Sequence, residues 1–149
     1  MSNQDKCLLG EARLRAADVL RGNACDIGLL SARRAYQQVH GRDSMISGLG
    51  LMLLNDAEAW DIYRRSIETL ANAQSRLGNI PFAVGYPDVP DESFVATGGV
   101  FAKGQQGQRQ PVVDTLHAGC VDNCLWYILG HYVYHRTTRD FDFLRRFWL

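Results

Sequence analysis

The sequence predicts an all-α domain of about four or five helices with one long loop rich in glycine and proline. Two segments, from about Asp43 to Leu54 and from Asp122 to about Thr137, are apolar on nearly every side, which is typical of helices in a protein interior. Each begins with an aspartate, and each is followed after a short break by an amphipathic segment. Repetition of this kind is typical of stacked helical hairpins.

The first helix is expected from Lys6 to Arg21, where apolar residues recur at helical spacing, and Gly22-Asn23 ends it. The segment Ala24 to Val39 shows no clear period, and we predict a mostly irregular connection there. After the first buried helix, Asn55-Asp56 breaks the pattern, and an amphipathic helix follows from about Ala57 to Ser75.

The long loop is expected from Gly78 to Cys120, which holds all four prolines and seven of the fourteen glycines. A structureless segment of this length is uncommon in a compact domain and is usually functional where it occurs. Within it, Phe94-Val95 and Val100-Phe101 can pair as a small hairpin across Gly98-Gly99.

A final amphipathic helix is expected from Phe141, after a break at Arg139-Asp140. Nothing in the sequence is expected to cover its apolar residues, which are Phe141, Phe143, Leu144, Phe147, Trp148 and Leu149. We therefore expect residues 1–149 to form one incomplete domain, truncated at the C-terminus. The missing C-terminal half, or another chain, would cover Phe141 to Leu149.

The composition indicates a globular protein and gives no sign of a nucleic-acid or membrane-surface partner. The chain has 149 residues, 46% of them hydrophobic and 21% charged, which is typical of one globular domain. Sixteen basic residues balance sixteen acidic ones, so neither a nucleic-acid nor a membrane-surface partner is indicated. The polar start, the absence of a long apolar run and four scattered cysteines favour a cytoplasmic protein with reduced thiols.

Asp43, in the run GRDS, and Asp122, in the run GCVDNCLWY, each have two interpretations. Spacing alone favours helix capping, in which the carboxylate accepts backbone N–H bonds. In the functional interpretation, Arg42 and Asp43 hold sugar hydroxyls, and Asp122 is one of the two carboxylates that glycoside hydrolysis requires. The dipole at a helix N-terminus disfavours the protonated form that a general acid needs, so burial beside Trp126 would have to outweigh it.

Two patterns of histidine and cysteine are candidates for metal sites. His131 and His135 have metal-compatible spacing but lack the glutamate of HExxH and an obvious third ligand, so packing is the favoured interpretation. The set His117, Cys120 and Cys124 lacks a CxxC pair. No phosphate-cradling loop is present, and we expect neither a metal nor a cofactor.

Two blocks of sequence resemble those of bacterial amylo-alpha-1,6-glucosidases, which are glycogen-debranching-like glycoside hydrolases of the six-hairpin superfamily. The first block is YQQVHGRDSMISGLGLMLLNDAEAWDIYRRSIETLANAQSRLGNIP, and the second is HAGCVDNCLWYILGHYVYHRTTRDFDFL. The first has Arg-Asp before a leucine-rich helix and ends in Gly-x-Ile-Pro, and the second has Val-Asp before Leu-Trp-Tyr. Together they cover roughly Tyr36 to Leu144, in the order of the family.

The resemblance implies a partial (α/α)6 barrel, in which inner and outer helices alternate around a substrate pocket. It implies that Asp122 is the general acid and that Trp126 lines the pocket wall. Arg42 and Asp43 would bind sugar at the cleavage subsite, with His40 and Asn123 as further substrate-binding residues. The implied substrate is an α-glucan or a related oligosaccharide, and no cofactor is implied.

The sequence departs from the family pattern in two respects. His40 stands where the pattern usually has Trp, and the region that supplies the second catalytic carboxylate is not in this chain. Since one member of a cooperative pair has little activity alone, we predict that this polypeptide does not hydrolyse glycosides by itself. Two alternatives remain: a non-catalytic helical protein that binds sugar or a partner chain, and a fragment of a neutral-invertase-like fructoside hydrolase.

Overall fold

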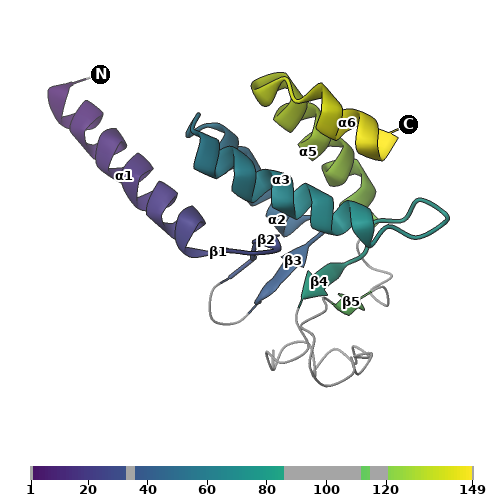
Figure 1. Ribbon diagram of the computed structural model, residues 1–149. Coiled ribbons are helices and arrows are strands. Elements are labelled where there is room, and N and C mark those ends of the chain that lie inside the picture. Colours follow the sequence, from purple (N-terminus) through teal and green to yellow (C-terminus); the bar gives the residue numbers. More distant parts are fainter. Residues whose placement is uncertain (1, 33–35, 86–111, 115–120, 149) are drawn as a thin grey trace.

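The computed structural model describes residues 2–32, 36–85, 112–114 and 121–148. Its helices are α1 (Asn3–Gly22), α2 (Asp43–Met52), α3 (Ala57–Asn72), α5 (Asn123–Thr138) and α6 (Phe141–Trp148). Its strands are β1 (Ala24–Cys25), β2 (Gly28–Leu29), β3 (Gln38–His40), β4 (Ala83–Gly85) and β5 (Val112–Asp114). The described part is mostly helical, as the sequence predicted, and Figure 1 shows its helices grouped on one side of a small sheet.

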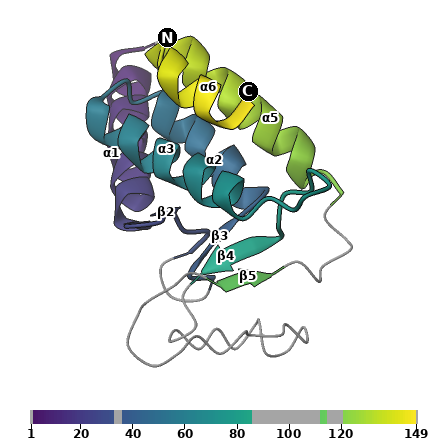
Figure 2. The same cartoon turned by 45° about the vertical axis from the view of Figure 1, so that its right-hand side comes forward.

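Helix α1 confirms the first predicted helix and ends beside Gly22-Asn23, as expected. Ser2 caps it, because the Ser2 hydroxyl accepts from the backbone N–H of Asp5 while the Asp5 carboxylate accepts from that of Ser2. Figure 2 shows α1 along one edge of the helical layer, and it contacts α2. Ala17 is buried, but Leu8 and Leu14 are exposed, so the described residues leave most of its apolar face uncovered.

The segment Ala24 to Val39, predicted to be mostly irregular, contains two short strands and the start of a third. β1 and β2 pair antiparallel with Ala24 opposite Leu29, while β3, β4 and β5 form an antiparallel sheet in that order. In this sheet His40 of β3 is opposite Ala83 of β4. The described part of the segment is otherwise irregular, as predicted, and the sequence missed the strands because two or three residues are too short to show a period of two.

Two fully buried serines attach strand β2 to the helices. Ser66 on α3 accepts from the N–H of Leu29 at 2.7 Å and donates to the carbonyl of Ile62 at 3.1 Å. Ser44 on α2 donates to the carbonyl of Leu29 at 2.7 Å and accepts from the N–H of His40 at 2.9 Å. Each hydroxyl is therefore both donor and acceptor, which satisfies polar backbone groups inside the core.

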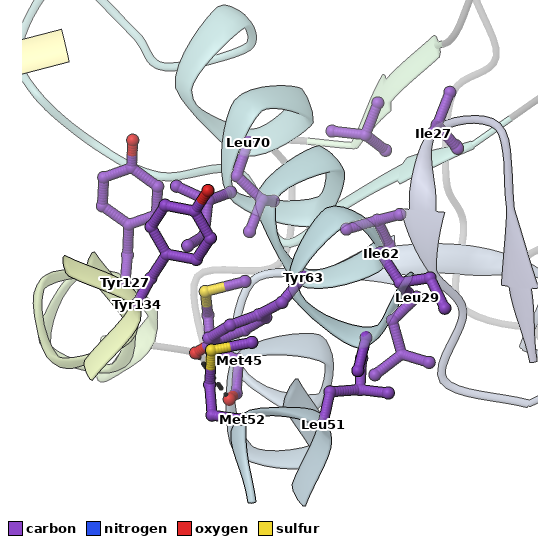
Figure 3. Close-up of a cluster of buried hydrophobic side chains, with 14 of the residues drawn as sticks. Ile27, Leu29, Met45, Leu51, Met52, Ile62, Tyr63, Leu70, Tyr127 and Tyr134 are labelled. Atoms are coloured by element: carbon purple, nitrogen blue, oxygen red, sulfur yellow. Dashed lines mark hydrogen bonds between the residues drawn. The ribbon is translucent and has the colours of Figure 1, made fainter. Parts of the chain in front are cut away.

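The core is centred on Tyr63 of α3, which has no exposed surface and lies where α2, α3 and α5 meet (Figure 3). Its hydroxyl donates to the carbonyl of Met45 at 3.0 Å. Gly48 of α2 lies against its ring, and Gly130 of α5 would place a Cβ only 2.7 Å from its hydroxyl oxygen. The two glycines therefore allow two helices to approach one aromatic side chain closely.

Helix α5, predicted to be buried on nearly every side, is only half covered by the described residues. Its inner face is buried at Tyr127, His131 and Tyr134. Its outer face is exposed at four apolar residues, which are Leu125, Ile128, Leu129 and Tyr132. The composition predicted the helix correctly but not which of its faces is covered.

Helix α6 packs against α5, so the expectation of an uncovered C-terminal helix is wrong for part of it. Phe143 is buried, and the guanidinium of Arg64 lies over its ring at 5.0 Å from the centroid. Arg146 of α6 pairs with Glu68 of α3 at 2.8 Å. Phe141 is exposed, and Leu149 lies outside the described residues, as does the hairpin predicted at Phe94-Val95 and Val100-Phe101.

None of the described helices combines the length and the apolar character that crossing a bilayer requires.

Candidate active site

The candidate active site lies where the N-terminal ends of α2 and α5 come together. Gly41 makes this approach possible: its N–H donates to the carbonyl of Phe82 at 2.9 Å. A Cβ at this position would lie 2.7 Å from the carbonyl oxygen of Pro81 and 2.9 Å from Cγ of Asn123. A larger residue would push apart the start of α2, the entry to β4 and the start of α5, so glycine is required here for packing.

Arg42, which follows Gly41, joins the two aspartates that the sequence singled out. Its Nε lies 3.3 Å from Oδ1 of Asp43, and its Nη1 lies 3.8 Å from Oδ2 of Asp122. The three side chains are between 37% and 48% exposed, so these ion pairs add little to stability. What they do is bring the GRDS run and the VDN run of the sequence to one polar surface.

Neither aspartate acts as a helix cap through its side chain. Arg42, not Asp43, occupies the N-cap position of α2, and Asp122 occupies that of α5 without a side-chain capping bond. The capping interpretation, which spacing favoured, is therefore wrong for both residues. Two other aspartates do cap: Asp56 before α3 accepts from the N–H of Ala59 at 2.9 Å, and Asp140 before α6 accepts from that of Phe143 at 3.0 Å.

Trp126 fixes one oxygen of the Asp122 carboxylate. The two residues are four apart on α5, and the indole N–H donates to Oδ2 of Asp122 at 3.1 Å. Arg42 forms its ion pair with the same oxygen at 3.8 Å, so both contacts are made to Oδ2, and Oδ1 is the oxygen left to accept from another donor. Trp126 itself is half-buried and packs against the core, so its indole supports the site from below.

His40 and Asn123, implied as substrate-binding residues, lie buried beneath this surface. Nδ1 of His40 is 2.8 Å from the hydroxyl of Ser31 and 3.2 Å from the carbonyl of Gln38. The amide of Asn123 donates to the carbonyl of Pro81 at 3.2 Å, and its Oδ1 has no hydrogen-bond partner among the described residues. A direct role for either in binding sugar stays a prediction.

Sequence reasoning missed the aromatic residues that surround His40. The ring of Phe82 meets that of His40 edge-on at 5.1 Å between centroids, and Tyr36 does so at 6.0 Å. Phe82 follows the Ile-Pro pair that closes the first sequence block, and Tyr36 opens that block. Their positions were therefore visible in the sequence, but their convergence on His40 depends on the pairing of β3 with β4.

The histidines weighed as metal ligands are packing residues where the structure describes them. His131 lies against Tyr127 at 4.6 Å and is stacked on Phe143 at 5.9 Å between ring centroids. His135 meets the ring of Phe141 at 4.5 Å. Within the described ranges no three His, Cys, Asp or Glu side chains are grouped as metal ligands, and His117 and Cys120 lie outside those ranges.

Comparison of the chain with protein-family models, with curated proteins and with solved structures found no match. The resemblance to debranching-type glycosidases therefore stays a prediction, and it depends on the sequence blocks quoted above.

Proposed function

We propose that this chain forms part of a glycoside hydrolase that acts on an α-glucan or a related oligosaccharide. The observation that carries the proposal is the position of Arg42 between Asp43 and Asp122, with the Trp126 indole bonded to the second carboxylate. Carboxylates and a guanidinium at one half-exposed surface supply both donors and acceptors for sugar hydroxyls. The N-terminal ends of α2 and α5 come together at this surface, where Arg42 contacts both aspartates.

In this proposal Asp122 is the general acid, and Arg42 and Asp43 hold the sugar at the cleavage subsite. The acid gives its proton to the oxygen of the departing sugar, while a second carboxylate activates water or attacks the anomeric carbon. That second carboxylate would come from outside this chain. We therefore expect the 149-residue polypeptide to bind sugar without turning it over.

The proposed architecture is part of an (α/α)6 barrel. Two features support it: the pairs α2–α3 and α5–α6 are each joined by a short turn, and α2 contacts α5. In such a barrel α2 and α5 would be neighbouring inner helices, with α3 and α6 outside them.

Calorimetric titration of the chain with malto-oligosaccharides tests sugar binding. We expect saturable heat from the wild type and an affinity about ten- to a hundredfold lower in Arg42→Ala, because a hydrogen-bonded charge is lost. Arg145→Ala is the matched control, since Arg145 is exposed and pairs with Asp142 of its own helix. Equal affinity of the Arg42 variant and the wild type would contradict the proposal. Titration with sucrose tests the neutral-invertase-like alternative, which predicts heat of binding with sucrose.

The catalytic part of the proposal needs a complete enzyme that contains this chain. There, Asp122→Asn should remove most of the turnover while leaving sugar affinity close to that of the wild type. Unchanged turnover would exclude Asp122 as the general acid.

A second candidate is a non-catalytic helical protein that pairs with a partner chain, and the outer face of α5 favours it. Leu125, Ile128, Leu129 and Tyr132 are exposed there without a charged residue between them. Uncovered apolar surface of this kind usually marks an interface. A cooperatively folded chain that gives no heat with any of the sugars, and that forms complexes in sedimentation velocity, would favour this candidate.

A further inference from the structure

Helix α1 is the least covered of the described helices. Its residues 4–16 are all exposed, and Ala17 is the one buried residue of the helix among those the structure describes. Figure 1 shows its N-terminal end at the edge of the molecule. A helix in a protein is stabilised mainly by packing one face against other elements, so about three turns without such packing indicate a surface that is covered by something else.

Apolar residues form a stripe along one side of α1. Successive residues of an α-helix are about 100° apart, so residues three and four apart share a face. The stripe residues are Leu8, Leu9, Ala12, Ala16, Val19 and Leu20. Leu9 and Val19 are 57% and 62% exposed. Leu14 is equally apolar and 68% exposed, but it lies on the opposite side of the helix from the stripe.

The C-terminal part of the stripe forms one wall of a groove between α1 and α2. The groove has a volume of about 470 Å³. The lining residues are Arg15, Ala16, Val19, Leu20, Ile46, Ser47 and Gly50. Four of them are apolar or lack a side chain beyond Cβ, and Arg15 supplies the charge at the edge. The N-terminal part of the stripe has no such wall beside it, because residues 4–16 are exposed.

The charges beside the stripe indicate what covers it. Glu11 and Arg15 lie on one flank and form an ion pair at 2.5 Å, with side chains that are 54% and 78% exposed. When two copies of α1 lie antiparallel with their stripes together, the same flank of each copy meets across the contact. With Ala12 opposite Ala16 of the other copy, Glu11 lies within about 3 Å along the axis of the other Arg15. The flanks are therefore complementary in charge, and a parallel pair would put them on opposite sides.

We propose that α1 pairs antiparallel with α1 of a second copy of this chain. The small side chains of Ala12 and Ala16 let the two helices approach closely at the centre. Leu9 of each copy packs beside Val19 of the other, which gives one patch that is complementary to itself, as a twofold dimer requires. This surface is separate from the proposed sugar site and does not depend on it.

The same arrangement fills the groove. The stripe residues opposite the groove wall of one copy are Leu8 and Leu9 of the other, so these two leucines enter between α1 and α2. Each copy covers the groove of its partner with the part of α1 that has no cover of its own. One contact thus accounts for the exposed turns, the groove and the flanking charges.

Sedimentation velocity of the 149-residue chain at several concentrations tests the pairing, with a reductant present because Cys7 on α1 is exposed. The wild type should sediment as a dimer that dissociates on dilution. Leu9→Ala should weaken the dimer about a hundredfold, because buried apolar surface is lost twice in a twofold contact. Leu14→Ala is the matched control and should leave the dissociation constant unchanged. A wild type that stays monomeric up to its solubility limit, or an association that Leu9→Ala does not weaken more than Leu14→Ala, would overturn the proposal.

Charge exchange tests the direction of the pairing. Glu11→Arg and Arg15→Glu should each weaken self-association about tenfold, because like charges then face each other across the flank. An equimolar mixture of the two variants should associate about as tightly as the wild type, since every charge meets its opposite again. A variant that had lost its fold could not be restored by mixing, so recovery in the mixture separates pairing from folding. A mixture that associates no better than either variant alone would overturn the antiparallel pairing.

Discussion

Helices α2 and α5 begin alike but are covered very differently. Each starts beside Arg42, and each sets a glycine against Tyr63. Helix α2 lies among α1, α3, α5 and two strands, whereas α5 contacts α2, α3 and α6 among the described elements. Leu51 of α2 consequently has no exposed surface, while Leu125 of α5 is 69% exposed.

The inner face of α5 is also the more polar of its two faces. Asn123 and His131 are buried there, and the tyrosines carry hydroxyl groups. The outer face is aliphatic apart from Tyr132 as far as the last turn, where Arg136 is exposed. Hydropathy alone would predict the opposite orientation, with the aliphatic face buried and the more polar face exposed. The comparison with α2 shows that burial depends on which neighbours a helix has, and that apolar composition alone does not specify its orientation.

The sharpest test of the comparison is one substitution made in both helices. Leu51→Ala should lower the free energy of unfolding by about 2–5 kcal/mol, because it leaves a cavity in the core. Leu125→Ala should change it by less than about 0.5 kcal/mol, because the side chain is mostly in solvent already. Urea unfolding followed by circular dichroism measures both. A large loss in Leu125→Ala would show that the outer face of α5 is covered in solution.

The packing of α5 should depend on pH through His131. Burial among Tyr127, Phe143 and Phe147 lowers the pKa of His131 to about 4, while the unfolded chain has a value of about 6.5. The folded state therefore binds fewer protons between these values. Its stability is full above pH 6.5 and declines as the pH falls towards 4, by up to about 3 kcal/mol.

His131→Gln isolates this contribution from the carboxylates, which titrate in both proteins. The variant should be less stable than the wild type at pH 7, and the difference should shrink by about 2–3 kcal/mol at pH 4.5. Urea unfolding at the two pH values gives the comparison. Parallel pH profiles would mean that His131 does not control the pH dependence.

The helices were predictable because their signals are local. The apolar period of α3 and the breaks at Gly22-Asn23 and Asn55-Asp56 are contained within a few turns of chain. The strands were not, because β3 is specified by pairing with β4, which follows more than forty residues later. Which face of α5 is buried is non-local for the same reason.

The candidate site was predictable only in part. The motif blocks pointed to Arg42, Asp43, Asp122 and Trp126, and the structure brings these four residues together. The sequence could not show that Gly41 permits the approach or that His40 and Asn123 would be buried beneath it, since both depend on contacts with Pro81 and Phe82. Nor could it separate an aspartate that caps a helix from one that pairs with Arg42.

The shared contact with Tyr63 can be tested by adding one methyl group at each glycine. Gly48→Ala should cost about 1–3 kcal/mol, because the methyl group would overlap the ring of a residue that cannot move freely. Gly130→Ala should cost less, because its Cβ would lie 2.7 Å from the Met45 sulfur and from the Tyr63 hydroxyl oxygen, whereas a Cβ at Gly48 would lie 2.0 Å from the ring. Gly10→Ala on α1, where nothing lies within 4 Å, should stabilise the protein by about 0.5–1 kcal/mol. The same change would thus have opposite signs in packed and unpacked helices.

The smallest expected effect separates the two kinds of aspartate at helix starts. Asp56→Ala should lower the free energy of unfolding by about 1 kcal/mol, because the N–H of Ala59 loses its acceptor, and Asp56→Asn should keep most of the cap. Asp43→Ala should change it by less than about 0.5 kcal/mol, because Asp43 accepts no backbone N–H and pairs with Arg42 in solvent. If Asp43→Ala proved as costly as Asp56→Ala, the carboxylate would be structural. If Asp43→Ala leaves the free energy of unfolding unchanged, the sugar affinity of that variant is the next quantity to measure. A loss of affinity without a loss of stability would assign Asp43 to the site.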